Sequence, residues 1–532
     1  MDGHRVGVGG RGCGHATTAA NADARAWPPL LWWSLGAGVL AFATAKWRGG
    51  RAFAPVMAFA YIFPAVMLLT HAFLDPAYWN IWMAGLLGAT LGVADLHAWR
   101  FPARWKWPLA YWALAIALVW PAVIAREADF SWALMSEYHI GNSAFGGSPP
   151  VLAVWVLQIA LLHMLGLLWL DAACTAYPLD APDGSRERFV RDMVWPLASS
   201  VLLGSLVAIY QGAIDINWLN EHQYSVYKRA TASLDDGNAF GGVAGMWIGG
   251  LLALAASAGP RWRRGLAAVG VGIAGTGLWA TGSRMALLAA IVCAAFAVWF
   301  VITRRKRPLR DLALVGLPAV VLIGAYSAVA SRSQTASPID RVVRSLPGLD
   351  QKEIRHFISF ELWNRYGPYG TVSMNMVRDY PLSGVGVGSF NHIFPDESFA
   401  LIRDRAHADN AQSWYRHQLA ELGVLGSLGW LAWLFMFAGV LVRSHGDPDQ
   451  LFAASMVKGG LVGMAVISAV SMPTQSLPVA FTVWVFVYWY LLQSSAGARM
   501  AMATSARTQK PWWPLAIWAP SPCCGAKTNS TG

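Results

Sequence analysis

Apolar runs about as long as a bilayer is thick recur along most of this chain, and they constrain its fold more than any other feature. A transmembrane helix needs about 20 mostly apolar residues. Of the 532 residues, 56% are hydrophobic and only 13% are charged, whereas soluble chains carry about 25% charged residues. The sequence predicts an all-α polytopic membrane protein with about 12–13 transmembrane helices, at residues 27–45, 53–71, 79–94, 107–124, 150–170, 194–213, 237–258, 266–280, 285–303, 311–330, 419–442, 451–471 and 478–494.

Clusters of lysine and arginine between the spans predict the orientation, because short loops rich in these residues stay in the cytoplasm. Three such loops are an even number of spans apart, so they share the cytoplasmic face: residues 99–106, 260–265 and 304–310. Counting from them puts the N-terminal tail outside, although its arginines favour the inside, and the sequence leaves this conflict open. The excess of 40 Lys and Arg over 29 Asp and Glu comes mostly from these loops and predicts no nucleic-acid partner.

The spacing of the spans divides the chain into unequal parts. Most connections are short, but one outward loop is about 90 residues long, and long ordered loops are usually functional. The predicted parts are a tail at 1–26, transmembrane helices at 27–330, a large outer loop at 331–418, further transmembrane helices at 419–494 and a cytoplasmic tail at 495–532.

The large loop is predicted to contain short helices. Residues 361–380 have the periodicity of one amphipathic helix, and a second helix is predicted to start around Asn410 and to run into the next span. The first helix should lie along the membrane surface, with Arg365 and Arg378 toward water and with an apolar face formed by Trp363, Met374 and Val377.

Three glycines alternate in the loop stretch PLSGVGVGSF, residues 381–390: Gly384, Gly386 and Gly388. A nucleotide-binding loop would need a preceding strand, a following helix and, for a P-loop, a Gly-Lys-Ser/Thr ending. The sequence predicts none of the three, so the glycines predict a tight turn in which the backbone approaches a neighbouring element.

Four segments occur in the order seen in one known family. They are RATASLDDGNAFGGVAGMW (229–247), TGSRMALLAA (281–290), PLSGVGVGSFNHIFP (381–395) and HADNAQSWYRHQLAELGVLGSLGW (407–430). The set resembles the O-antigen ligase and polymerase superfamily, or Wzy-C family, over most of residues 225–440. Residues 1–190 match only in being hydrophobic spans.

The resemblance implies a GT-C-like helical fold in the bacterial inner membrane with its active face in the periplasm. Such enzymes take a glycan from undecaprenyl pyrophosphate and pass it to lipid A core, to a growing glycan or to a protein hydroxyl. The implied partners are therefore the lipid-linked glycan, one of these acceptors and the membrane lipids. No metal or other cofactor is expected, and none of the five cysteines has the spacing of a zinc site.

Three arginines on the predicted outer side suit a pyrophosphate leaving group. A planar guanidinium can bond two phosphate oxygens at once, and the candidates are Arg229, Arg284 and Arg365. Arg284 sits where a span begins, so helix-end amides could share the phosphate charge. The alternatives are that Arg284 extends to the lipid headgroups and that Arg229 fixes a loop.

An acceptor hydroxyl needs a base, and histidine suits this role near neutral pH. In the family the base commonly stands in a His-Asn pair about ten residues before a Gly-x-x-Gly, but here Gln412 and Ser413 occupy that position. The prediction is His407 oriented by Asp409, with His417 as the alternative base. Either histidine could instead cap a helix or hydrogen-bond a loop.

Three residues at the start of the following span are predicted to be structural. Glu421 is a carboxylate at a membrane boundary, where it should pair with an arginine or cap nearby amides. Gly423 and Gly426 have a spacing that allows close helix contact.

Two other classes of protein remain open at the level of sequence. A transporter or flippase of lipid-linked sugar would also have many spans and basic loops, but transporters concentrate ionisable groups near the bilayer midplane. Here polar residues gather in the outward loops, which favours surface chemistry. A pure scaffold gives no reason for outward arginines beside a histidine-rich loop.

Overall fold

The structure, a computed structural model, describes residues 32, 35–47, 77–94, 103–125, 166, 168–179, 182–218, 220, 226–232, 234, 236–257, 260–304, 308–333, 351–364, 367–403, 410–443, 450–472 and 477–494. All the elements assigned in this part of the chain are helices. They are α3 (Ala77–Val93), α4 (Ala103–Ala125), α7 (Pro182–Phe189), the π-helix η3 (Val190–Val194), α8 (Trp195–Ala213), α10 (Gly237–Ala256), α11 (Arg261–Ala280), α12 (Arg284–Arg304), α13 (Pro308–Ser333), α15 (Gln351–His356), the π-helix η4 (Phe357–Trp363), α16 (Tyr369–Asp379), α17 (Phe390–Ile402), α18 (Trp414–Arg443), α19 (Leu451–Ser468) and α20 (Leu477–Gln493).

Five helices within the described residues are long and apolar enough to cross a membrane. They span Gly184–Ala213, Gly237–Ala256, Arg284–Thr303, Trp414–Arg443 and Leu451–Ser468. The prediction of an all-α polytopic membrane protein is therefore confirmed. The count of 12–13 spans stays a prediction, because the candidates at 53–71 and most of 150–170 lie outside the described residues.

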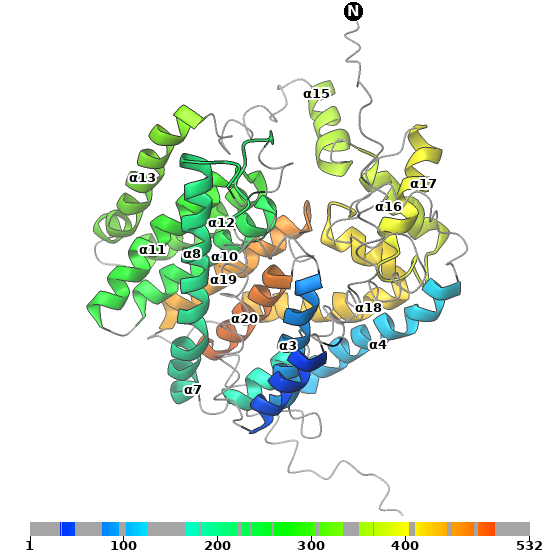
Figure 1. Cartoon of the computed structure of the whole chain (residues 1–532), viewed down its shortest axis with the longest axis horizontal. Helices are drawn as coiled ribbons and strands as arrows, with labels where there is room; N and C mark the ends of the chain where they lie inside the picture. The colour runs from blue at the N-terminus through cyan, green and yellow to red at the C-terminus, as the bar shows by residue number, and fades with distance from the viewer. Residues whose placement is uncertain are drawn as a thin grey trace, which may run out of the picture.

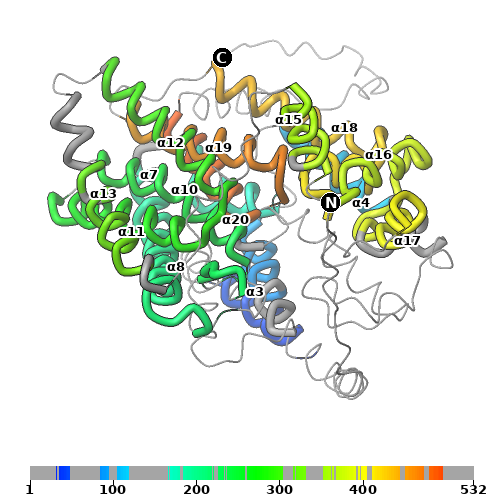
Figure 2. Tube along the Cα trace, turned by 90° about the horizontal axis from the view of Figure 1, so that it is seen from above, coloured from blue at the N-terminus to red at the C-terminus, as the bar shows by residue number. Residues whose placement is uncertain are grey.

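The helices form two groups that are visible from both directions (Figures 1 and 2). One group contains α8 and α10 to α13, with α19 and α20 beside them. The other group contains α4 and α18, with the loop helices α16 and α17 next to them. The two groups hold different candidate residues, so their relative placement matters for function.

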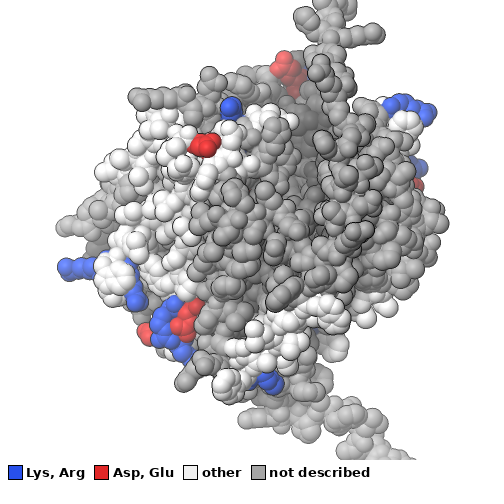
Figure 3. Space-filling model, in the orientation of Figure 1, with Lys and Arg blue, Asp and Glu red and all other residues white. Residues whose placement is uncertain are grey.

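The outer surface of the first group is apolar. On the face drawn in Figure 3, the described Lys, Arg, Asp and Glu side chains lie toward the edges and leave an uncharged area over α8, α11 and α13. In α13, Leu317, Val320 and Val321 are 62%, 68% and 57% exposed. Large apolar side chains can stay exposed in this way where they face lipid instead of water.

Helices α10 and α19 pack closely and run antiparallel. A Cβ added to Gly249 of α10 would lie 2.7 Å from the carbonyl oxygen of Met456, and one added to Gly460 of α19 would lie 3.3 Å from that of Met246. Small residues allow two helix backbones to approach in this manner. Because the pairing pattern is antiparallel, the first residues of α10 lie at the same end of the bundle as the last residues of α19.

The structure corrects the prediction of one amphipathic helix over residues 361–380. The chain forms η4, leaves helical structure at Asn364 and starts α16 only at Tyr369. Pro368 disfavours a helical conformation for the residue before it, and its missing N–H cannot continue the hydrogen-bond ladder. The predicted apolar face is not the buried one, because Trp363 and Met374 are 42% and 37% exposed. Helix α16 instead buries Gly370, Val372, Ser373 and Met376.

The boundary of the second loop helix also differs from the prediction. Helix α18 begins at Trp414, four residues after the predicted start. The N–H of Gln412 instead donates to the side-chain oxygen of Asn410 at 2.8 Å. An Asn side chain that bonds the backbone two residues ahead favours a turn over a helix.

Candidate functional site

The turn between α11 and α12 forms the first polar junction of the molecule. Gly282 has a φ of 60°, a left-handed conformation that ends α11 without a Cβ clash. The hydroxyl of Ser283 accepts from the N–H of Ala286 at 3.4 Å, so Ser283 caps the start of α12. Arg284 is consequently the first residue of α12, and its side chain is half-buried.

Arg229 joins this turn to the start of α10. It is only 7% exposed. Its Nε donates to the Thr281 carbonyl at 2.8 Å, and its Nη2 donates to the Asn238 side-chain oxygen at 2.7 Å. The same Asn238 oxygen accepts from the hydroxyl of Ser283 at 3.1 Å. The segments of Arg229 and Arg284, far apart in sequence, are therefore part of one junction.

Two amides hold the backbone on either side of Arg229. The side-chain nitrogen of Asn220 donates to the Arg229 carbonyl at 2.8 Å. The side-chain oxygen of Gln211, at the end of α8, accepts from the N–H groups of Thr231 and Ala232 at 3.1 and 2.9 Å. This network ties the loop after α8 to the junction, so Arg229 has a fixed backbone as well as a fixed side chain.

The glycine-rich stretch forms a second junction with α18. Helix α18 is broken at Gly423, whose φ of 63° and ψ of −172° are outside the helical range. Such a break leaves backbone groups without helical partners, and the glycine-rich turn supplies partners on both sides of it. The four hydrogen bonds are Val424 N–H to the Pro381 carbonyl (2.8 Å), Leu425 N–H to the Leu382 carbonyl (3.2 Å), Val385 N–H to the Ala420 carbonyl (2.9 Å) and Gly386 N–H to the Glu421 carbonyl (2.9 Å).

Glycine is required at two points of this junction. Gly384 and Gly423 both have positive φ, and their backbones face each other. A Cβ on Gly384 would lie 2.4 Å from the Glu421 carbonyl, and a Cβ on Gly423 would lie 2.5 Å from the Gly384 nitrogen. The stretch is thus a turn inserted against a broken helix.

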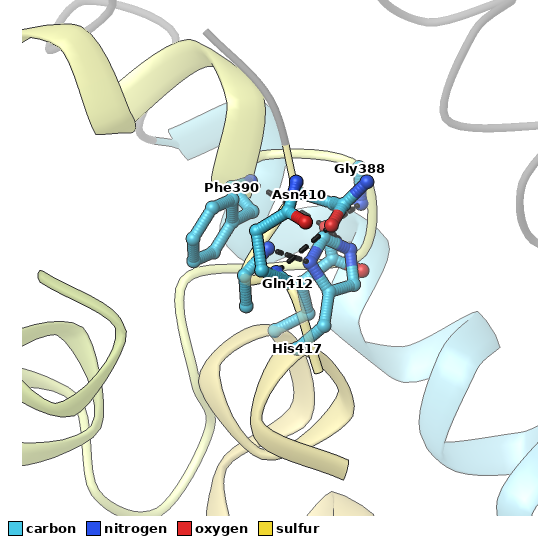
Figure 4. A network of polar contacts seen from close by, with 7 residues as sticks. Gly388, Phe390, Asn410, Gln412 and His417 are labelled. Carbon is cyan, nitrogen blue, oxygen red and sulfur yellow. Dashed lines mark hydrogen bonds and ion pairs between the residues drawn. The ribbon is translucent and has the colours of Figure 1, made fainter. Parts of the chain in front are cut away.

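Glu421 belongs to a buried polar network, and Figure 4 labels its partners Gly388, Phe390 and His417. Its side chain is 2% exposed, and one carboxylate oxygen accepts from Gly388 N–H at 2.8 Å and from Phe390 N–H at 3.5 Å. The same oxygen lies 3.2 Å from Nε2 of His417, one helical turn earlier in α18. Nδ1 of His417 in turn accepts from Ala411 N–H at 3.4 Å.

Arg416 holds the other side of the same segment. Its Nη2 donates to the Ala411 carbonyl at 2.9 Å, and its Nη1 donates to the Trp363 carbonyl at 2.8 Å. The guanidinium also lies 4.7 Å from the centre of the Trp363 ring, within the range of a cation–π contact. Neighbouring side chains of α18 therefore hold both the N–H and the carbonyl of Ala411.

The two junctions lie at the same end of the helical bundle. The N–H of Trp414, the first residue of α18, donates to the Ser471 carbonyl at 3.1 Å, just beyond the end of α19. Since α10 and α19 are antiparallel, the end of α19 is also the end where α10 begins, at Gly237. The first junction, which contains Arg229, and the second junction, which contains Glu421, can therefore face the same side of a membrane.

The predicted site residues fall into four groups. Arg229 and Arg284 meet at the first junction, while His417, Glu421, Gly384, Gly386, Gly388 and Gly423 meet at the second. Gly426 lies in α18 next to α4, where an added Cβ would be 3.7 Å from that of Ala115. Arg365, His407 and Asp409 lie outside the described residues.

Several residues of the junctions were missed by sequence reasoning. In the sequence, Asn238 was only part of a pattern typical of a helix start. Its bond to Arg229 joins the loop before α10 to the first turn of α10, and hydrophobic periodicity does not predict such a contact. Arg416 adjoins the predicted His417, but nothing in the sequence indicates its contact with Trp363. The spacing of His417 and Glu421, one turn apart, was the only visible signal of their pairing.

No group of three or more His, Cys, Asp or Glu side chains within the described part of the chain is arranged to hold a metal ion. The charged and amide side chains of the two junctions are arranged instead to fix backbone turns at one end of the bundle. They can present a guanidinium and a turn to a ligand that arrives at the membrane surface.

Long apolar helices with polar junctions gathered at one end define a multi-pass, all-α membrane protein. Residues 269–431, which include Arg284, the glycine-rich turn and the start of α18, match the Wzy_C family model, described as O-antigen ligase. This segment is therefore similar to the O-antigen ligase family, which supports the resemblance found in the sequence and a function of that general type. No curated protein matches the chain.

Proposed function

We propose that this protein transfers a glycan from undecaprenyl pyrophosphate to an acceptor hydroxyl at the periplasmic face of the bacterial inner membrane, as an O-antigen ligase. The observation that carries the proposal is the Wzy_C match over residues 269–431. That range covers the turn between α11 and α12 in the first junction and the glycine-rich turn with the start of α18 in the second, and both junctions lie at one end of the bundle. Lipid-linked glycan and acceptor would both be reached from that end.

Arg284 is the proposed main contact for the pyrophosphate. It is half-buried at the first turn of α12, where the positive end of the helix dipole also favours an anion. Arg229 supports this role from behind, because its bonds to Thr281 and Asn238 fix the turn that precedes Arg284. Arg365 remains a proposed third contact on the basis of the sequence.

His407, oriented by Asp409, is the proposed base that takes the proton of the acceptor hydroxyl. The geometry of His417 favours this choice over the alternative. Both ring nitrogens of His417 already face protein groups, Glu421 on one side and Ala411 on the other, and the residue is 7% exposed. A base needs a free nitrogen within reach of the proton that it removes.

Two further activities fit the same family match. A polymerase would join lipid-linked repeats to each other, and a protein-directed transferase would use a protein hydroxyl. The proposed chemistry at Arg284 and His407 is shared by all three activities. They differ only in the acceptor, so the acceptor is what the experiment has to identify.

The test is a clean deletion of the gene in its host, with surface glycans separated on a gel and with lipid A core and glycoproteins blotted alongside. Loss of all polymer from the core, with accumulation of lipid-linked polymer, is expected for a ligase. Core that carries a single repeat would identify a polymerase instead. Unchanged lipopolysaccharide with under-glycosylated protein would identify a protein-directed transferase, and no change in any glycan would favour the transporter class.

A further inference from the structure

We infer that Glu421 is a positioning residue that couples the glycine-rich turn, through His417, to the segment that follows the proposed base His407. The inference deepens the proposed function and rests on it for its catalytic consequence. The coupling joins three chain segments by direct contacts: the turn at 388–390, the first turns of α18 and the stretch at 410–412.

The first link of the coupling is the bond between Glu421 and the turn. The carboxylate accepts from Gly388 N–H at 2.8 Å and from Phe390 N–H at 3.5 Å. Phe390 is the first residue of α17, and the hydroxyl of the preceding Ser389 makes no capping bond there. The Glu421 carboxylate therefore provides the negative charge that stabilises the start of α17.

The second link is His417. Its Nε2 lies 3.2 Å from the Glu421 carboxylate, and its Nδ1 lies 3.4 Å from the nitrogen of Ala411. An N–H can point at Nδ1 only if Nδ1 carries no proton, so the proton of a neutral imidazole is on Nε2 and is donated to Glu421. The ring is further held by Phe390, whose ring centre is 4.9 Å away.

The third link is the fixed position of Ala411. This residue is fully buried, with its N–H on His417 and its carbonyl on Arg416. Ala411 follows the proposed base by only four residues. A histidine that acts as a base must be held in a near-attack position, and a displacement of about 1 Å can cost about 10²-fold in rate. Glu421 thus contributes, through His417, to the fixed position of Ala411.

Hydrogen exchange of the purified full-length protein tests the coupling without any assay of activity. In Glu421→Ala, exchange should accelerate at the amides of Gly388 and Phe390 and also at Ala411. In His417→Ala, exchange should accelerate at Ala411 and stay slow at Gly388. Thr90→Ala, which removes the buried 2.8 Å hydroxyl bond to the Leu86 carbonyl in α3, is the matched control and should change neither region.

The same variants test the catalytic consequence in a reconstituted transfer assay with lipid-linked glycan and acceptor. Glu421→Ala and His417→Ala should each lower kcat by about 10²-fold with little change in KM, and the double variant should be no slower than either single one. Glu421→Gln keeps an oxygen acceptor and should restore most of kcat.

Contrary results would separate the inference from the proposed function. Slow exchange at Ala411 in Glu421→Ala, or losses in kcat that multiply in the double variant, would overturn the coupling. If Glu421→Ala does not insert, Glu421→Gln and His417→Ala still decide the question. A wild-type protein that transfers no glycan, while exchange responds as expected, would overturn the proposed function and leave the coupling of the three segments in place.

Discussion

Arg229 and Arg284 belong to the same junction, yet they have different surroundings. Arg229 is almost fully buried, and its guanidinium bonds a backbone carbonyl and an amide side chain. Arg284 is half-buried at a helix start. The comparison separates an arginine that fixes the fold from one whose side chain is partly accessible.

Replacing Arg284 with lysine should abolish most transfer activity and leave expression and membrane insertion intact. Lysine keeps the charge but loses the planar fork that bonds two phosphate oxygens at once. The measurement is glycan transfer in a strain that expresses the variant, with its membrane level checked by blotting. Full activity of Arg284→Lys would contradict the proposed contact with pyrophosphate.

Replacing Arg229 with lysine should instead destabilise the protein. A lysine cannot span both the Thr281 carbonyl and the Asn238 oxygen, and one lost hydrogen bond to a charged group costs about 1.5–3 kcal/mol. Thermal unfolding of the purified protein in detergent measures this loss. Unchanged stability together with lost activity would show that Arg229, too, acts on the substrate.

At the level of single residues, the sequence was enough to select candidate residues, but it did not indicate which groups they contact. The types of Arg229, Arg284 and Glu421 and their places near span ends were sufficient to select them. The partner amides of Glu421 belong to Gly388 and Phe390, more than 30 residues away in sequence. A pattern read along one chain contains no information about such contacts.

The element that most depends on its neighbours is α18, because its hydrogen-bond ladder is interrupted at Gly423 and completed by the turn at 381–386. An isolated break would leave backbone groups unsatisfied at the membrane boundary, which is costly. The turn and the helix thus form one structural unit.

Replacing Gly384 with alanine should destabilise this unit strongly. The left-handed backbone costs about 1–2 kcal/mol for an L-residue, and overpacking against the Glu421 carbonyl costs about 1–3 kcal/mol, which together give about 2–5 kcal/mol. Gly439→Ala in α18 is the control, because an added Cβ there meets nothing within 4 Å.

The comparison of the two variants is made by thermal unfolding in detergent. Gly439→Ala should be neutral or stabilising by up to about 1 kcal/mol, since alanine is the better helix former. Equal stabilities for the two alanine variants would mean that the backbone contact between Gly384 and Gly423 does not support the junction.

The limits of sequence reasoning at this scale are visible in the large loop. The amphipathic period over residues 361–380 predicted one helix, although the Gly367-Pro368 pair was a signal for the break that the structure contains. The break at Gly423 had no comparable signal, because glycine in an apolar span is ordinary in membrane helices. Its cause is a turn from another part of the loop.

The described residues form a set of mostly apolar helices with two polar junctions at one end. The spans were the easiest feature to predict, because about 20 apolar residues bounded by charges have few other structures available. For example, α12 and α19 begin within one residue of the predicted spans. The sequence could not predict that both junctions lie at the same end of the bundle, because this follows from the packing of α10 against α19.

The predicted orientation can be tested by labelling single cysteines in a variant without native cysteines. Lys352 in α15 and Trp262 in α11 are both exposed, and the basic loop before α11 is predicted to be cytoplasmic. A membrane-impermeant maleimide added to intact spheroplasts should label Lys352→Cys and not Trp262→Cys. The opposite pattern would invert the topology.

The interrupted helix α18 also determines an order of events during synthesis. Synthesis runs from the N-terminus, so residues 381–386 are made before Gly423, Val424 and Leu425. In the predicted orientation those residues must also cross the bilayer before the bonds to Val424 and Leu425 can form. The final register of α18 therefore depends on a segment that is made earlier and that would have to be translocated first.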